Sequence, residues 1–316
     1  VPSVKVYLTY DFRLNDAEVL QILKRMKELG GVTAFHCENH EVVDYYRKKY
    51  VAEGNTAPIY HAKSRPNLAE AEAVARVLNL ARLAGDAPVY VVHLSTKEGL
   101  AAILDARRKG QKNIYVETCP QYLLLDDSRY NLPGFEGAKF VLSPPLRGAE
   151  DQTALWAGLE AGEIDTIGTD HCSFHFKGVK ELGLRDFSQI PNGIPGVEHR
   201  PVLMYTAAVA AGRVSAHRMM KLLSEQPAKL FGMYPRKGAL AVGSDADIVI
   251  FDPEYTGCIT SAAQHQAADY TPYEGLKTKG RAETVLLSGE PAVEDGRVIA
   301  EGRGRFVRRG PSRFWR

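Results

Sequence analysis

Four polar side chains stand where buried strands would be expected to carry apolar ones. Lys5, His36, His93 and Asp170 each lie within, at the end of, or a few residues after a short apolar, β-branched run. Two imidazoles and a carboxylate are ligands that divalent cations such as zinc prefer. One histidine at a strand end is more often a packed core residue than a ligand. A second histidine in the same structural position, together with the aspartate, favours a metal site.

Lys5 needs an explanation of its own, because a protonated amine inside a sheet is costly to desolvate. Its ammonium group either extends to the rim of the sheet or is chemically changed. Carboxylation of the amine by CO₂ would turn the cation into a carbamate anion, whose two oxygens can bridge two metal ions. The residue pattern alone leaves both alternatives open.

The elements that would position these groups alternate between strand and helix from residue 1 to about 170. Apolar runs predict the strands, and helical periodicity predicts the helices between them. Such alternation predicts a parallel sheet covered by helices, in which the carboxyl ends of all strands point to one side. The expected strands are about 4–9, 32–35, 89–92, 114–116 and 164–167, and the expected helices begin after Asn15 and cover about 67–84, 97–109 and 150–161.

Five such strands fit either part of a closed (β/α)₈ barrel or an open doubly wound sheet. A long loop over about 171–199 and helical segments over about 200–232 complete a first domain, residues 1–233. Beyond Tyr234 the pattern changes to β-strands, with Pro253 and Gly289 as breaks. We therefore expect residues 234–316 to form a small β domain with a C-terminal arm.

The C-terminal arm is basic, with aromatic side chains between its arginines. We expect it to pack on a neighbouring subunit rather than to bind RNA. The residues concerned are Arg303, Arg305, Phe306, Arg308, Arg309, Arg313, Phe314, Trp315 and Arg316.

Composition excludes several classes of protein. The 316 residues are 45% hydrophobic and 25% charged, which is ordinary for a globular chain and not for a disordered one. Forty Lys and Arg against 38 Asp and Glu leave a net charge of +2, which indicates neither nucleic-acid nor membrane binding by bulk charge. No apolar run approaches the roughly 20 residues of a membrane helix. The 4 cysteines are scattered without a CxxC pair, which favours a reducing, cytoplasmic location.

Nine segments resemble dihydropyrimidinases and bacterial D-hydantoinases, and they occur in the order of that family over nearly the whole chain. One such motif would be weak evidence, whereas nine in order are specific. The segments are KVYLTY (5–10), FHCEN (35–39), YHAKSRP (60–66), VHLST (92–96), ETCPQYL (117–123), SPPLR (143–147), GTDHC (168–172), PNGIPGVE (191–198) and the stretch 234–250 that begins YPRKG.

The resemblance implies an α/β fold, a (β/α)₈ TIM barrel of the amidohydrolase type, here strands four to eight, with a small β-sandwich. It also implies two divalent metal ions, commonly zinc, bridged by carboxylated Lys5. His36 and His93 would hold the more exposed ion, and Asp170 would bind the other and transfer protons. A homotetramer is implied as well.

The resemblance assigns three further residues to the substrate site. Tyr10 matches the tyrosine that hydrogen-bonds the developing oxyanion. Ser143 and Asn192 match positions that bind the ring amide, largely through main-chain groups. His61 and His171 lie in family-like segments, but we expect them to pack or to support the site rather than to bind metal.

One feature of the family is missing. Its members carry a His-x-His pair at the end of the first barrel strand, and no His-x-His occurs in this sequence. We expect the pair to belong to an N-terminal stretch outside this chain, together with three strands and the first part of the sandwich. For the chain alone this leaves two alternatives open, an active enzyme and a chain that is inactive because these ligands are absent.

The expected activity is metal-dependent hydrolysis of the cyclic amide of dihydropyrimidines or 5-substituted hydantoins to N-carbamoyl amino acids. One alternative is a related ring-opening amidohydrolase such as an allantoinase. Another is a non-catalytic scaffold that shares the fold, as in the collapsin-response mediator proteins. Retention of Lys5, His36, His93 and Asp170 argues against a scaffold, which has no need of a buried lysine among imidazoles.

Overall fold

The computed structural model describes residues 2–314. Five strands form one parallel sheet in which every strand pairs with the next along the chain, with no reversal of order. A doubly wound sheet reverses its strand order, whereas a barrel does not, so the alternative of a doubly wound sheet is wrong. The strands are β1 (Ser3–Tyr7), β2 (Val32–His36), β3 (Val89–Val91), β4 (Ile114–Thr118) and β5 (Thr166–Ile167).

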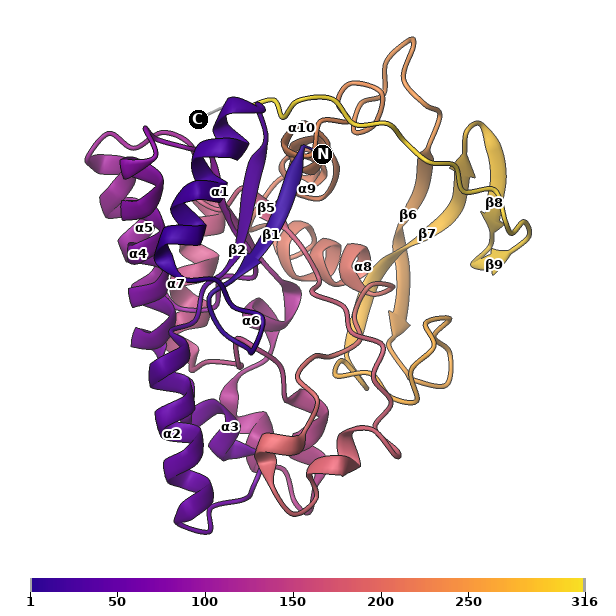
Figure 1. The fold of residues 1–316 in the computed structure, drawn as a ribbon. Coiled ribbons are helices and arrows are strands. Elements are labelled where there is room, and N and C mark those ends of the chain that lie inside the picture. Colours follow the sequence, from indigo (N-terminus) through magenta and orange to yellow (C-terminus); the bar gives the residue numbers. More distant parts are fainter. Residues whose placement is uncertain (1, 315–316) are drawn as a thin grey trace.

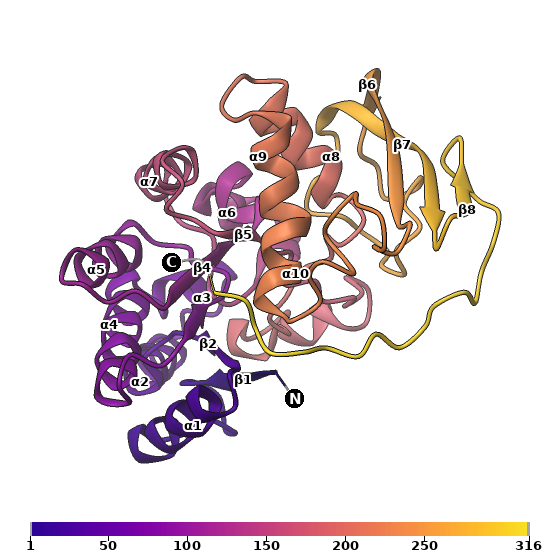
Figure 2. The same cartoon turned by 90° about the horizontal axis from the view of Figure 1, so that it is seen from above.

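Helices cover the convex side of this curved sheet (Figures 1 and 2). The first begins with a capping box, in which the side chains of Asn15 and Glu18 each accept the other's backbone N–H. The ends of the three predicted later helices lie within one residue of the observed ones. The four helices are α1 (Asp16–Glu28), α4 (Asn67–Leu83), α5 (Lys97–Arg108) and α7 (Ala149–Glu160).

Three helices were not predicted from the sequence, and they lie on the loops that follow the strands. The longest of them buries only Val43 fully, so its apolar periodicity is weak. Short 3₁₀ turns occupy the same loops. The helices are α2 (His40–Ala52), α3 (Ile59–Lys63) and α6 (Pro120–Leu124), and the turns are η1 (Asp127–Asn131), η2 (Glu136–Phe140), η3 (Lys180–Gly183) and η4 (Phe187–Gln189).

Side chains on the two faces of the sheet belong to different cores. Phe35 and Val91 face the helices and join the main hydrophobic core. Their neighbours Ala34, Tyr90 and Tyr115 point to the concave face and form a smaller cluster there. This alternation is the period-2 geometry of a strand, and it explains why the strands read as continuous apolar runs.

The chain then crosses to a second sheet through three short helices with π-helical turns between them. In Figure 2 α9 and α10 lie between the parallel sheet and the second one. The helices are α8 (Arg200–Met204), α9 (Ala216–Met220) and α10 (Gln226–Leu230), and the turns are η5 (Tyr205–Val209) and η6 (Lys221–Glu225).

The second sheet is antiparallel, in the order β6-β7-β8-β9. The prediction that Pro253 breaks a strand is wrong. Pro253 lies inside β6, where the pairing register shifts between Asp252 and Thr256. A proline without an N–H is tolerated at such an irregularity. The strands are β6 (Ile248–Cys258), β7 (Lys277–Leu287), β8 (Glu290–Glu294) and β9 (Arg297–Val298).

The C-terminal arm returns from β9 to the parallel sheet (yellow in Figures 1 and 2). The backbone N–H groups of Gly310, Ser312 and Arg313 donate to carbonyls of this same chain. Phe314 stacks on Tyr115 of the concave cluster, with ring centroids 5.5 Å apart. Residues 310–314 thus pack on this same chain, and Trp315 and Arg316 lie outside the described residues. The expectation that the arm packs on a neighbouring subunit stays a prediction. None of the helices described is long and apolar enough to cross a lipid bilayer.

Candidate active site

The four polar residues of the strands converge at the carboxyl edge of the parallel sheet. His36 ends β2, and its Nδ1 lies 3.0 Å from Nε2 of His93, which follows β3. Lys5 lies in the middle of β1, and its Nζ is 3.8 Å from Oδ1 of Asp170, which follows β5. Asp170 and Lys5 are both close enough to influence the charge of His93. The pair of His36 and His93 and the pair of Lys5 and Asp170 thus lie next to each other at this edge of the sheet.

The protonation states of this group follow from burial. His93 is buried, and this lowers its pKa to about 3, although the charge of Asp170 acts in the opposite direction. Its imidazole is therefore neutral, which is the form that binds metals. Burial also disfavours the charged form of Lys5, but Asp170 and Tyr7 outweigh it and raise the pKa of Lys5.

Glu38 orients the imidazole of His36. Its Oε2 lies 2.7 Å from Nε2 of His36 and accepts a hydrogen bond of 2.6 Å from Arg65. Burial alone would raise the pKa of Glu38, but the charge of Arg65 and the hydrogen bond of His36 lower it well below its usual range. An ionised carboxylate can only accept, so His36 donates through Nε2. In the neutral ring the lone pair then lies on Nδ1, the atom that faces His93.

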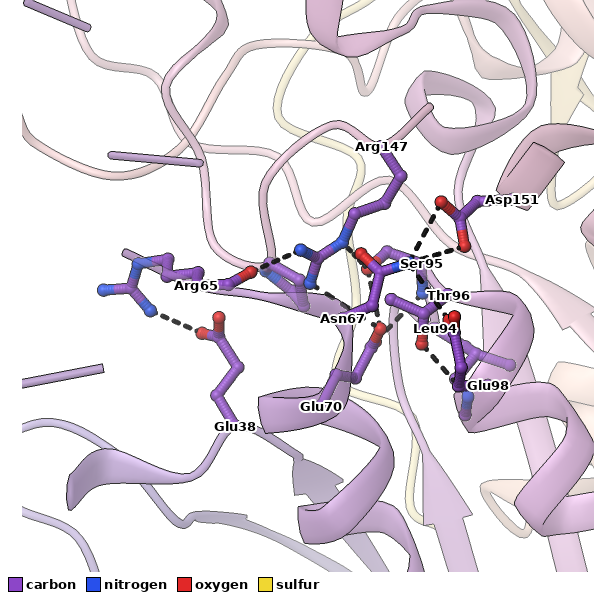
Figure 3. A network of polar contacts seen from close by, with 12 residues as sticks. Glu38, Arg65, Asn67, Glu70, Leu94, Ser95, Thr96, Glu98, Arg147 and Asp151 are labelled. Atoms are coloured by element: carbon purple, nitrogen blue, oxygen red, sulfur yellow. Dashed lines mark hydrogen bonds and ion pairs between the residues drawn. The ribbon is translucent and has the colours of Figure 1, made fainter. Parts of the chain in front are cut away.

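A buried polar network continues from this pair toward the loop after β3 (Figure 3). Arg147 donates to the carbonyl of Arg65 and, through Nε, to Ser95 at 3.0 Å. Ser95 in turn donates to the carboxylate of Glu70, through its hydroxyl at 2.8 Å and through its backbone N–H at 3.0 Å. The loops that carry His36 and His93 are therefore tied together by charged side chains that are all buried.

Glu117 supports His93 from the neighbouring strand β4. Its Oε1 accepts the backbone N–H of His93 at 3.1 Å, and its Oε2 accepts the hydroxyl of Tyr90 at 2.6 Å. Burial raises the pKa of Glu117 against the effect of these hydrogen bonds. A Cβ at Gly168, which directly follows β5, would come within 2.4 Å of the carboxylate, so this position needs a glycine.

Backbone strain is concentrated at the same edge. Tyr10, His93 and Asp170 have φ values of 73°, 41° and 46°, in the left-handed region that residues with a side chain rarely adopt. Such conformations persist where the surroundings enforce them, and they gather at functional sites.

Tyr10 lies beside the two loop residues expected at the substrate site. Burial raises the pKa of Tyr10, although Arg65, Ser143 and Asn192 favour its ionised form. Ser143 Oγ is buried and has no hydrogen-bond partner of good geometry. The tyrosine, the serine and the asparagine are thus brought together next to Arg65.

His61 and His171 contact main-chain groups instead of the four converging residues. Nε2 of His61 lies 2.8 Å from the carbonyl of Leu142, and Nδ1 of His171 accepts the N–H of Gly196 at 3.0 Å. Burial lowers the pKa of His61 to about 3, so it donates as a neutral imidazole. Both histidines hold loops in place.

Divalent cations would suit the donors gathered here. Nδ1 of His36 and Nε2 of His93 face each other, and the other ring nitrogen of His93 is buried without a partner. Within residues 2–314 no group of three or more His, Cys, Asp and Glu side chains is arranged as a metal site. His36, His93 and Asp170 therefore do not form one three-ligand group. They form two contact pairs, His36 with His93 and Asp170 with Lys5, and Lys5 becomes a ligand only when carboxylated.

Comparisons with known proteins show the family of this chain. A family model described as amidohydrolase family matches residues 3–292. A D-phenylhydantoinase of Escherichia coli O81 (strain ED1a) is 48% identical over 310 residues, which are 98% of this chain and 67% of that protein. The chain thus spans about two thirds of the length of this relative.

Solved structures are similar over the whole described fold. The crystal structure of dihydropyrimidinase from Brevibacillus agri NCHU1002 has a TM-score of 0.97 and 45% identity, and the match covers 99% of this chain and 68% of that one. D-hydantoinase (dihydropyrimidinase) from Thermus sp. has a TM-score of 0.96 and 44% identity, with 99% of this chain and 69% of that one covered.

Proposed function

The chain belongs to the amidohydrolase family, and from this premise we propose that it hydrolyses the cyclic amide bond of 5-substituted hydantoins or dihydropyrimidines to N-carbamoyl amino acids. The observation that carries the proposal is the contact between His36 and His93 beside the pair of Lys5 and Asp170. The names of the similar proteins support the choice of substrate, since they are hydantoinases and dihydropyrimidinases.

Two divalent cations, zinc by preference, would be held by His36, His93, Asp170 and the carboxylated form of Lys5. When bound, such ions supply hydroxide near neutral pH and polarise a carbonyl group. The neutral state of His93 and the orientation of His36 by Glu38 support this assignment.

Tyr10 would donate its hydroxyl proton in a hydrogen bond to the carbonyl oxygen of the substrate as negative charge develops there. Its raised pKa keeps the phenol protonated and therefore able to donate. Ser143 and Asn192 lie beside this hydroxyl and would bind the ring amide, which places the reacting carbonyl next to Tyr10.

Asp170 would accept a proton from the attacking hydroxide and pass it to the ring nitrogen that leaves. Its side chain is only partly exposed and faces Lys5 and His93. The strained backbone at Asp170 supports this role, since the conformation directs the carboxylate toward the cluster.

A non-catalytic scaffold would not need this arrangement. Burying His36, Glu38 and Arg65 together costs desolvation that an apolar core of equal volume would avoid.

We further propose a cytoplasmic location, supported by four cysteines that are all free in the structure. We also propose a homotetramer, which the family resemblance alone supports.

The proposal is tested by incubating the zinc-loaded chain with 5-phenylhydantoin and measuring N-carbamoyl phenylglycine. We expect ring opening that Asp170→Asn abolishes and that Asp11→Asn, at an exposed position of the same residue type, leaves intact. Equal activity of wild type and Asp170→Asn would overturn the assigned role. Absence of both zinc binding and ring opening in the wild-type chain would overturn the proposed function.

A further inference from the structure

Lys180 is a lysine with no contact to solvent. Its side chain is 0% exposed, in the 3₁₀ turn η3 (Lys180–Gly183). Nζ donates to the carbonyls of Val141 and Pro191, both at 2.6 Å. The ring of Phe174 lies 5.9 Å from the same nitrogen. No carboxylate of the described residues forms an ion pair with it.

An amine at this place needs a reason. Burying it costs free energy, and a methionine of similar length would fill the volume without that cost. The two carbonyl contacts are what methionine could not provide. The contribution of Lys180 at this place is therefore its two hydrogen bonds to carbonyl groups, and not an ion pair.

The protonation of Lys180 agrees with this view. Burial lowers its pKa to about 7, against a small opposing influence of Cys172. A neutral amine still has two N–H groups, so both carbonyl contacts persist when the third proton is lost. The two hydrogen bonds by which Nζ connects the carbonyls of Val141 and Pro191 therefore form both below and above neutral pH.

The two carbonyls belong to the segments that carry the expected ring-binding residues. Val141 precedes Ser143 by two positions, and Pro191 directly precedes Asn192. Both residues lie beside the hydroxyl of Tyr10. The distance between these two carbonyls therefore helps to set the distance between Ser143 and Asn192.

Other hydrogen bonds hold the same two segments, and Lys180 is the side chain that contacts both of them. The N–H of Gly193 donates to the carbonyl of Val141 at 3.0 Å, and Nε2 of His61 lies 2.8 Å from the next carbonyl, of Leu142. On the other side, the N–H of Cys172 donates to the carbonyl of Ile194 at 3.0 Å. The carbonyl of Val141 accepts from Gly193 and Lys180 together.

We propose that Lys180 is a positioning residue, whose Nζ clamps the Ser143 and Asn192 segments against each other and so fixes the ring-binding side of the site. The inference rests on the proposed function for the identity of the ring, but the clamp itself does not. It acts through Ser143 and Asn192 and touches neither the substrate nor the four converging residues.

The clamp is tested by hydrogen–deuterium exchange of the full chain, with Lys180→Met to remove the donors and Lys180→Gln to keep an NH₂ group. Lys177→Met is the matched control, since that lysine is exposed three residues away. In Lys180→Met we expect exchange in peptides 141–146 and 190–196 to rise about tenfold, the effect of losing roughly one to two net hydrogen bonds. Lys180→Gln and Lys177→Met should stay close to wild type.

The consequence for binding is measured on the same proteins with 5-phenylhydantoin. In Lys180→Met we expect KM to rise about tenfold, while kcat and zinc content change little. Lys180→Gln should restore most of the affinity. A merely structural lysine would lower the folded fraction without this split between KM and kcat.

Each result decides one part of the inference. Unchanged exchange in both peptides would overturn the clamp, and faster exchange with unchanged KM would overturn its positioning role. If wild type neither binds nor opens the hydantoin, the proposed function fails, and the exchange data still decide the clamp. If Lys180→Met does not fold, Lys180→Gln decides: slow exchange supports the clamp, and fast exchange contradicts it.

Discussion

Glu38→Gln would remove a buried charge while keeping the shape of the side chain. Glu38 is 0% exposed, and its Oε2 contacts Arg65 at 2.6 Å and His36 at 2.7 Å. Breaking a buried ion pair by removing one partner costs about 3–5 kcal/mol. Out of a total stability of about 5–15 kcal/mol, such a loss is large, and we expect it to appear as a lower urea midpoint.

The same substitution would weaken the support of His36. Arg65 and Nε2 of His36 both contact Oε2, so the glutamine oxygen can take its place while the NH₂ group replaces Oε1, which has no partner. The hydrogen bond from His36 then goes to a neutral oxygen instead of a carboxylate, which makes Nδ1 a less basic metal ligand. A changed support of this kind lowers metal affinity by about 10–100-fold, which corresponds to about 1.4–2.8 kcal/mol.

Two assays separate these effects. Urea unfolding followed by circular dichroism in chelator gives the stability, and zinc titration by calorimetry gives the affinity. Glu41→Gln is the matched control, because its carboxylate is 80% exposed and pairs with Arg13 at 3.5 Å. We expect it to change the free energy of unfolding by less than about 1 kcal/mol. Zinc affinity of Glu38→Gln equal to that of Glu41→Gln would refute the reasoning.

Three further outcomes are expected. Tyr10→Phe should lower kcat for hydantoin opening by about 100-fold with little change in KM, as expected for loss of an oxyanion donor, and an unchanged kcat would contradict this. Phe314→Ala should lower the free energy of unfolding by about 1–2 kcal/mol, because Phe314 covers Tyr115, whereas Phe306→Ala, at an 87% exposed side chain, should not. The stability of wild type relative to Lys180→Gln should rise between pH 7 and pH 10.5, since an unfolded lysine keeps its proton up to about 10.5 and folded Lys180 loses it near 7; a flat difference in urea titrations over this range would contradict it.

The strands could be predicted because both of their faces are buried. Val89 and Val91 pack on the helices while Tyr90 faces the concave side, so no polar residue interrupts the run. The helix α2 was missed because most of its surface is polar and exposed. The path of the C-terminal arm was missed too, since contacts such as that of Phe314 with Tyr115 leave no local pattern in the sequence.

The site shows the same division. His36 and His93 were recognisable because each follows an apolar run, and a parallel sheet gathers such ends at one edge. Glu38, Arg65 and Lys180 were not singled out, because their partners are distant along the chain: 27 residues separate Arg65 from Glu38, and 39 separate Lys180 from Val141. Only Glu117, an acid within an apolar strand, left a local signal that sequence reasoning overlooked.

Zinc content measured by mass spectrometry, after loading and gel filtration, tests most directly whether the converging strand ends hold metal. Wild type should retain at least one zinc ion per chain, His93→Ala should lose it, and His175→Ala, at an exposed histidine, should retain it. Equal zinc in wild type and His93→Ala would contradict the account.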